Sequence, residues 1–262
     1  MSVETVLVTG ASSGIGLELA KCFAADGCRL ILLARKRNSL QTLAEELRQA
    51  HKTQSEVFPA DLAEPGTPAR VFGHLQGNGT KVDVLVNNAG FGAQGRFSEL
   101  SVERQLELLQ VNVVALTHLT RLFLPGMIAR SRGGVLNVAS TAGFQPGPGM
   151  AVYYASKAYV LSFSEALAEE LVGTGVKITA LCPGPTATNF AEAASARSSR
   201  LFKMSVMTAE SVGRIGHQSF RSGRVVAVAG WRNRLLGLSV RFTPRSVVRK
   251  ITKRLNIASS AS

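Results

Sequence analysis

Short apolar segments alternate with helix-patterned segments along most of the 262-residue chain. The apolar segments lack the alternating polar positions of a strand with one face in water, so both faces of each predicted strand should be buried. Strands of this kind, separated by helices, form a parallel sheet that helices cover on both faces. The sequence therefore predicts an α/β, doubly wound parallel sheet of about seven strands. The predicted strands are 3–9, 28–34, 56–59, 82–86, 134–139, 176–181 and 224–229, and the predicted helices are 14–26, 39–50, 64–76, 102–130, 151–172 and 208–221.

The first predicted strand runs into a glycine-rich turn, Thr9-Gly10-Ala11-Ser12-Ser13-Gly14-Ile15-Gly16, which opens the first helix. A dinucleotide pyrophosphate binds at such a turn because glycines let the backbone approach it and the helix N-terminus offers amide donors. The glycine spacing differs from the general dinucleotide fingerprint, and a glycine-rich turn alone is often only a tight turn. Its place between an opening strand and a helix favours a Rossmann-type single domain that binds a dinucleotide.

The end of the second predicted strand indicates which dinucleotide binds. An enzyme that uses NAD usually has an acidic residue here, which holds the ribose 2′-hydroxyl. This chain instead has Ala34-Arg35-Lys36-Arg37. The Arg35 guanidinium suits a 2′-phosphate, so NADP(H) is the predicted cofactor. Lys36 and Arg37 are equally well explained by a solvated basic loop.

A tyrosine and a lysine, Tyr153 and Lys157, lie four residues apart near the start of a predicted helix. They project from one face, and the ammonium, together with an oxidised nicotinamide, is expected to lower the pKa of the phenol. Ser140 follows the fifth strand, at the sheet edge where ligands of such folds bind, and Asn112 lies among apolar residues of a long helix. Taken singly, each has an alternative interpretation without a functional role. The Tyr153–Lys157 pair would be a chance spacing, Ser140 a serine that caps a turn, and Asn112 a buried amide bonded to backbone or water. Tyr154 faces another way and is interpreted as a packing residue.

In this order and at these spacings, the motifs closely resemble the short-chain dehydrogenase/reductase family in its single-domain form, over residues 5–229. The resemblance implies a catalytic tetrad and a cofactor cleft. The implied catalytic residues are Asn112, Ser140, Tyr153 and Lys157. The implied cofactor contacts are Gly10, Ser12, Ser13, Gly14 and Ile15 at the pyrophosphate, Arg35 at the 2′-phosphate, Asp61 and Leu62 at the adenine, Asn88, Ala89 and Gly90 beneath the cofactor, Tyr153 and Lys157 near the nicotinamide ribose, and Pro183, Gly184, Thr186 and Thr188 beside the nicotinamide.

The resemblance also implies the reaction, hydride transfer between the nicotinamide and a carbonyl or secondary alcohol carbon. In the reducing direction, Ser140 would polarise the carbonyl and Tyr153 would protonate its oxygen. Lys157 would tune Tyr153 and hold the nicotinamide ribose, while Asn112 would position a water for a proton relay. A lipophilic ketone, such as a 3-oxoacyl or steroid-like substrate, is favoured because residues 189–207 include several apolar side chains that would cover it. Ordinary core contacts would explain these side chains equally well. The alternative is a non-catalytic NADP(H)-binding redox sensor, which the presence of both Tyr153 and Lys157 disfavours.

The formal net charge of +13 is carried by the last quarter of the chain. Residues 1–196 hold 16 basic and 16 acidic residues, whereas residues 197–262 hold 14 basic residues and one acid. We predict a Rossmann-type dinucleotide-binding and catalytic region over 1–230 and a basic amphipathic C-terminal extension of the same domain over 231–262. Thr243-Pro244 is predicted to start a helix in this extension. The apolar stripe of that helix is Val247, Val248, Ile251 and Leu255.

Three roles are open for the extension. Packing of the stripe on the domain or on a sister subunit is favoured, but an anionic membrane surface or an acidic carrier of the substrate would also suit the charge. Nucleic acid is not an expected partner because few aromatic residues lie among the cations. The family resemblance implies a homo-oligomer, either a dimer or a tetramer.

The cysteines and the N-terminus indicate the compartment. Cys22, Cys28 and Cys182 form no paired framework and are interpreted as small buried side chains in a reducing compartment. No secretory signal precedes the first strand, so a cytoplasmic location is expected, with peripheral membrane association left open. The four histidines lack metal-ligand spacing, so no metal is expected.

Overall fold

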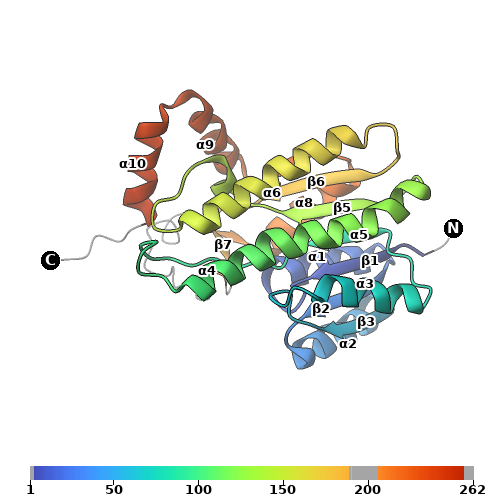
Figure 1. Ribbon diagram of the computed structural model, residues 1–262. Coiled ribbons are helices and arrows are strands. Elements are labelled where there is room, and N and C mark those ends of the chain that lie inside the picture. The colour runs from blue at the N-terminus through green and yellow to red at the C-terminus, as the bar shows by residue number, and fades with distance from the viewer. Residues whose placement is uncertain (1–2, 189, 191–205, 257–262) are drawn as a thin grey trace.

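The predicted parallel sheet is present in the computed structural model, which describes residues 3–188, 190 and 206–256. The strands are β1 (Thr5–Thr9), β2 (Arg29–Ala34), β3 (Ser55–Pro59), β4 (Val84–Asn87), β5 (Gly134–Val138), β6 (Lys177–Cys182), β7 (Thr186–Ala187), β8 (Met207–Thr208) and β9 (Val226–Val228). Seven of them form one parallel sheet in the order β3-β2-β1-β4-β5-β6-β9 (Figure 1). The pair β7 and β8 forms a second, small sheet that the sequence did not predict.

Helices cover both faces of the large sheet, as predicted. The α-helices of the described residues are α1 (Gly14–Ala25), α2 (Arg37–His51), α3 (Thr67–Gly77), α4 (Val102–Leu109), α5 (Leu116–Ala129), α6 (Ala151–Glu170), α8 (Ala209–Arg221), α9 (Trp231–Phe242) and α10 (Arg245–Asn256), of which α9 and α10 lie beyond the sheet at one end of the molecule. One apolar cluster joins the sheet to α1, α2 and α8, and another joins its opposite face to α3 and α5. Strand β1 contributes to both, because Val6 and Val8 belong to the first cluster and Leu7 to the second. This two-sided burial explains why the strands are apolar at consecutive positions.

The sheet order places a crevice between β1 and β4. The chain proceeds from β1 outward to β2 and β3, and then returns to pair β4 with the other edge of β1. The connections therefore leave the carboxyl ends of β1 and β4 in opposite directions, which is where open α/β sheets bind their ligands. The glycine-rich turn after β1 and the segment Asn88–Gly90 after β4 consequently meet at one edge.

The long helix predicted over 102–130 contains a π-helical segment, η1 (Gln110–Ala115), between α4 and α5. Asn112, a predicted catalytic residue, lies in this segment, and such wide turns often occur at functional sites. Within the described residues, Val102–Ala129 is the one helical stretch long and apolar enough to cross a membrane. It packs here on the sheet through a buried stripe, so it serves as a core helix. The stripe is Val111, Ala115, Leu119, Phe123 and Met127.

The C-terminal extension forms two helices rather than the single predicted one. Helix α9 was not predicted, and α10 begins at Arg245, one residue later than predicted. Thr243 is the C-cap of α9, and its hydroxyl donates to the Ser239 carbonyl (2.8 Å), so it does not cap α10 as predicted. The predicted stripe of α10 is wrong in part, because Val247 and Ile251 are 43% and 50% exposed. The helix is rotated so that its buried positions fall four residues apart and include two polar side chains, which find hydrogen-bond partners. The buried residues are Val248, Thr252 and Asn256.

The cysteines are free thiols, and two of the three are buried as predicted. Cys182 is fully buried at the end of β6, and burial raises the pKa of its thiol to about 12. Cys28 is also buried and its pKa is likewise raised to about 12, first by burial and then by its hydrogen bond to Glu4. Cys22 is half-buried. A thiol protonated at neutral pH is a poor nucleophile, so the packing interpretation of Cys182 holds.

Candidate active site

The glycine-rich turn after β1 is shaped by the segment that follows β4. Gly10 and Gly14 have φ angles of 65° and 58°, in the left-handed region that favours glycine. A Cβ at Gly10 would lie 2.8 Å from Nδ2 of Asn88, and one at Gly16 would collide with the same atom. The turn therefore needs glycines for its own packing against Asn88 as well as for any ligand.

Hydrogen bonds fix these two segments to each other. The Asn88 side chain donates from Nδ2 to the carbonyls of Thr9 (2.9 Å) and Gly10 (3.2 Å). The Thr9 hydroxyl accepts from the backbone nitrogens of Asn88 (2.9 Å) and Ala89 (3.0 Å) and donates to the Val86 carbonyl (3.1 Å). The sequence did not single out Thr9, although a hydroxyl at the last position of the first strand was the available signal.

The first turn of α1 is open to an anion. Ser13 is the N-cap residue in an extended conformation, its side chain makes no capping hydrogen bond, and no acidic residue lies in the first helical turn. The helix dipole and the first backbone amides of α1 therefore have no side-chain acceptor among the described residues. This is the geometry that a pyrophosphate requires. The predicted contacts Ser12, Ser13, Gly14 and Ile15 all lie at this helix start.

The opposite wall of the cleft is the segment from Pro183 to Thr188. A Cβ at Gly14 would lie 3.0 Å from the Thr188 methyl carbon, so the segment faces the start of α1 closely. The Thr186 hydroxyl donates to the Gly184 carbonyl (2.9 Å) and so stabilises the turn. The predicted pyrophosphate contacts and the predicted nicotinamide contacts thus face each other at Gly14 and Thr188. A side chain at position 14 would crowd the Thr188 methyl group, so glycine is needed there.

Ser140 and Tyr153 meet at the carboxyl end of β5. Ser140 is the N-cap of a short 3-10 helix, η2 (Thr141–Phe144), and its Oγ accepts from the Ala142 nitrogen (3.1 Å). The same hydroxyl donates to the Pro183 carbonyl (3.4 Å), and it lies near enough to the Tyr153 phenol to lower the pKa of that phenol. Ser140 can therefore cap the short helix and also act in the site. Capping uses its oxygen as an acceptor, which leaves its hydroxyl hydrogen available to another group.

Lys157 reaches from α6 toward the end of β4. Its Nζ donates to the Val138 carbonyl (2.7 Å), lies 6.0 Å from the centre of the Tyr153 ring and would lie 3.5 Å from a Cβ at Gly90. Burial lowers the pKa of Lys157 to about 8, and the nearby Cys182 opposes the shift. The ammonium thus sits between the tyrosine and the floor of the predicted cofactor cleft.

The Tyr153 phenol is buried, and its surroundings in the protein shift its pKa. Burial raises this pKa well above its ordinary value, the hydrogen bond with Ser140 lowers it in part, and the neighbouring Tyr154 raises it. Among the described residues, Lys157 is not a cause of the shift, and its Nζ points to the Val138 carbonyl. The expectation concerned Lys157 together with the positive charge of a bound oxidised nicotinamide, so it stays a prediction. A tyrosine that keeps its proton suits the role of an acid.

Asn112 is buried and uses its side chain to join two segments. Nδ2 donates to the Phe91 carbonyl (3.0 Å) and to the Ser156 hydroxyl (3.1 Å), while Oδ1 accepts from the Phe91 nitrogen (3.1 Å). Both amide hydrogens are thus used within the protein, and a water would find only the second lone pair of Oδ1. The predicted role of Asn112 in holding a water stays a prediction.

A buried polar chain beneath the site was missed by the sequence reasoning. Asn87 on β4 donates to the Thr120 hydroxyl (3.0 Å) and to Oδ1 of Asn137 on β5 (2.9 Å), and Asn137 donates to the Ser164 hydroxyl (2.9 Å). These bonds fix α5 and α6 to the strands that carry Asn88 and Ser140. The available signal was the asparagine inside each of two otherwise apolar strands.

Arg35 lies at the carboxyl end of β2 with its side chain 68% exposed. Its nearest acidic group is Asp61, whose Oδ2 lies 3.9 Å from the guanidinium, while Oδ1 of Asp61 accepts from the Ala63 nitrogen (2.9 Å). Leu62 is buried beside them. Helix α2 begins here with Lys36 as N-cap, Arg37 as first residue and no acid in its first turn. Cations at the positive end of a helix disfavour each other unless an anion binds between them.

The substrate side of the site is apolar. The Phe190 ring lies 5.1 Å from the Tyr153 ring, and Leu108, Ala142 and Met150 complete the cluster around it. Most of the predicted apolar cover, residues 189–207, lies outside the described residues. Tyr154 is buried as predicted, and it also donates from its hydroxyl to Oδ1 of Asn256 in α10 (3.1 Å), a contact that the sequence did not predict.

The lowered pKa of Lys157 gives a testable pH dependence. Lys157 is charged below its pKa of about 8 and neutral above it. We expect kcat/KM of the free enzyme to be level on the acid side and to fall about tenfold per pH unit above this value. A pH profile of kcat/KM for NADPH, at a saturating concentration of the ketone, would measure it, and a profile that rises through this range would contradict the prediction.

The doubly wound sheet, the glycine cradle at its switch point and the serine–tyrosine–lysine group define an oxidoreductase that uses a nicotinamide cofactor. The family model for short chain dehydrogenases matches residues 4–199. This chain therefore belongs to the short-chain dehydrogenase/reductase family.

Individual relatives agree with this assignment. The ketoacyl reductase HetN of Nostoc sp. is 34% identical over 181 residues, which are 69% of this chain and 63% of that protein. A short-chain dehydrogenase from Sphingobium yanoikuyae in complex with NADPH has a TM-score of 0.82 at 30% identity, with 99% of each chain covered. A family member from Burkholderia phymatum in complex with NAD has a TM-score of 0.80 at 26% identity, with 92% of each chain covered. Similar folds thus accept either cofactor.

Proposed function

We propose that this protein is an NADP(H)-dependent reductase of lipophilic ketones. The choice of NADP(H) rests on Arg35. This residue is exposed beside the cationic start of α2, at the position where NAD-dependent enzymes usually have an acidic residue. A 2′-phosphate would neutralise Arg35 and receive the helix dipole of α2. The NADPH complex of the Sphingobium dehydrogenase agrees with this choice, whereas the NAD complex of the Burkholderia protein does not decide it.

The proposed reaction assigns each residue of the tetrad a task. When bound, the reduced nicotinamide supplies the hydride that the carbonyl carbon takes up. Ser140 donates its hydroxyl hydrogen to the carbonyl oxygen in place of the long bond to Pro183, and Tyr153 delivers the proton to that oxygen. Lys157, whose Nζ lies near Gly90, would hold the nicotinamide ribose, and Asn112 fixes the Phe91 backbone to α6.

The substrate class rests on the apolar wall around Tyr153. Phe190, Leu108 and Met150 would contact a hydrocarbon group rather than a polar one. The name of HetN, a ketoacyl reductase, favours a 3-oxoacyl compound, and a steroid-like ketone suits the same wall. A non-catalytic redox sensor is the weaker alternative, because a sensor has no need for a buried acid beside a buried ammonium.

The test is NADPH consumption against 3-oxoacyl thioesters, steroid ketones, quinones and small ketones. We expect turnover with at least one lipophilic ketone and a lower KM as the hydrocarbon part grows. Binding of NADPH with no turnover on any of these compounds would favour the sensor. Turnover confined to small polar ketones would overturn the lipophilic substrate.

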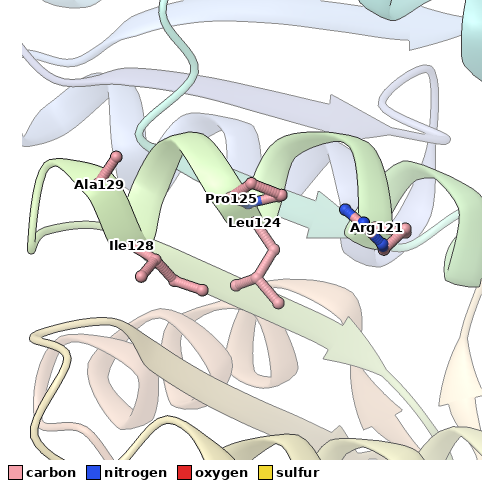
Figure 2. A pocket seen from close by; sticks show the side chains of 5 residues that line it. All are labelled: Arg121, Leu124, Pro125, Ile128 and Ala129. Carbon is pink, nitrogen blue, oxygen red and sulfur yellow. The ribbon is translucent and has the colours of Figure 1, made fainter.

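We also propose a homo-oligomer that packs through the long helices. Exposed apolar side chains on α4, η1 and α6 include Leu106 and Val114 at 60% and 49% exposure. A hollow of about 410 Å³ lies on α5, and Figure 2 shows its lining by Arg121, Leu124, Pro125, Ile128 and Ala129. Light scattering on the purified protein tests this proposal, and a monomer mass would contradict it.

A further inference from the structure

Helix α9 carries an apolar stripe that no part of the described chain covers. Four large side chains recur at the spacing of one helix face, i, i+4, i+7 and i+11, which places them within one narrow sector. All are exposed, and the last is the most exposed of the four. They are Trp231 (68%), Leu235 (58%), Leu238 (45%) and Phe242 (87%).

The opposite face of α9 attaches the helix to the domain. Nδ2 of Asn233 donates to the Ala229 carbonyl (2.6 Å), and its amide group would lie within 2.7 Å of a Cβ at Gly184. A Cβ at Gly237 would lie 3.4 Å from the Phe144 ring. Asn233 and Gly237 share a face that points away from the stripe, so the stripe is directed outward from the protein.

Cations flank this stripe on both sides. Arg232 lies on one side, and Arg234 and Arg241 lie on the other, by the helical spacing of α9. Helix α10 adds five more cations, and no acidic residue occurs between positions 231 and 256. The five are Arg245, Arg249, Lys250, Lys253 and Arg254.

Helix α10 holds this surface in place. Asn256, its last residue, is fully buried. Its Oδ1 accepts from the Tyr154 hydroxyl (3.1 Å), its Nδ2 donates to the Pro148 carbonyl (3.1 Å) and its own carbonyl accepts from Nε2 of Gln94 (2.5 Å). Figure 1 shows α9 and α10 as a helical pair at the end of the molecule where α4 and α6 begin. The apolar and cationic surface is therefore preformed, and it stands at the end of the protein that holds the site.

We infer that α9, with the cations of α10, docks this protein on an anionic lipid surface. An outward apolar stripe bordered by Arg and Lys suits the boundary between phospholipid head groups and acyl chains, and a surface without acids suits a negative leaflet. The inference stands apart from the proposed reaction, because the stripe and its flanking cations include no residue of the tetrad and no predicted cofactor contact.

A second copy of this chain and a nucleic acid both fit this surface less well than an anionic lipid surface. A symmetric contact between two copies would place the same cations against each other without any acid to pair with them. A nucleic acid would match the charge. However, two of the four side chains of the stripe, Leu235 and Leu238, are aliphatic and do not stack on bases.

The single tryptophan of the chain lies in the stripe, which gives a direct readout. Vesicles of phosphatidylcholine alone and of phosphatidylcholine mixed with phosphatidylglycerol are added to the intact protein at low and physiological salt. We expect co-sedimentation and a blue shift of Trp231 emission with the anionic vesicles, both weaker at higher salt. Binding should fall more than about tenfold in the double variant Leu235→Ser/Phe242→Ser, because both side chains lose their apolar burial in lipid.

Matched controls separate this surface from general stickiness. Val3→Ser/Val172→Ser removes two apolar side chains of similar exposure, 64% and 74%, from the start of the chain and from the segment after α6, and should leave vesicle binding unchanged. Circular dichroism and NADPH binding establish that each variant is folded. No binding by the intact protein, or equal losses in both double variants, would overturn the inference. A smaller molar mass of Leu235→Ser/Phe242→Ser in the absence of vesicles would also overturn it, by assigning the stripe to a subunit contact.

Discussion

Replacing Tyr153 with phenylalanine should reduce kcat by about 10²- to 10⁴-fold, the range that a general acid contributes. The phenol is buried beside Ser140 and burial raises its pKa, so it retains its proton for delivery to the carbonyl oxygen. Phenylalanine keeps the ring and its contact with Phe190 at 5.1 Å. The fold and the affinity for NADPH should therefore remain close to those of the unaltered protein. Steady-state kinetics and fluorescence titration with NADPH would measure the two effects separately.

Tyr159→Phe is the matched control on the same helix. Its hydroxyl lies 2.9 Å from the Thr117 hydroxyl on the exposed side of α6, away from Ser140, so the variant should keep its activity. Tyr154→Phe is a less neutral control than the sequence suggests, because it removes the bond to Asn256. We expect a mild loss of activity there. Equal losses in Tyr153→Phe and Tyr159→Phe would contradict the assignment of Tyr153 as the acid.

The parallel sheet could be predicted because its signal is local. A strand buried on both faces must be apolar at consecutive positions, and β1 shows this with Val6, Leu7 and Val8 divided between two cores. The Tyr153–Lys157 spacing was equally readable, since a helix fixes residues four apart on one face. These features depend on periodicity, which a single sequence contains in full.

The missed features depend on contacts between distant segments. The wide π-helical turn around Asn112 has no compositional mark, and Asn112 bonds to Phe91 and Ser156 across the fold. The rotation of α10 follows from the burial of Asn256, a polar residue that hydrophobic patterning assigns to the surface. The pKa of Tyr153 also depends on three-dimensional burial, which outweighs a lysine near it in sequence.

Changing Arg35 to aspartate should reverse or flatten a preference for NADPH over NADH. The 2′-phosphate would lose a charge-assisted hydrogen bond of about 1.5–3 kcal/mol, which corresponds to about a 10- to 100-fold loss in kcat/KM with NADPH. The new carboxylate would be able to accept the ribose 2′-hydroxyl of NADH, although Asp61, now 3.9 Å from the guanidinium, would repel it. The NADPH loss should therefore exceed the NADH gain.

Arg37→Asp tests whether position 35 or general charge decides the preference. Arg37 is the first residue of α2 and is exposed, so the substitution changes the net charge by the same amount as Arg35→Asp. An acid at the start of a helix also favours the helix, so the fold should be retained. We expect Arg37→Asp to weaken NADPH binding by severalfold and to leave NADH kinetics unchanged, because a displaced carboxylate cannot reach the ribose. Equal effects of the two variants would reduce the role of Arg35 to long-range attraction, and an unaltered protein that prefers NADH would overturn the choice of cofactor.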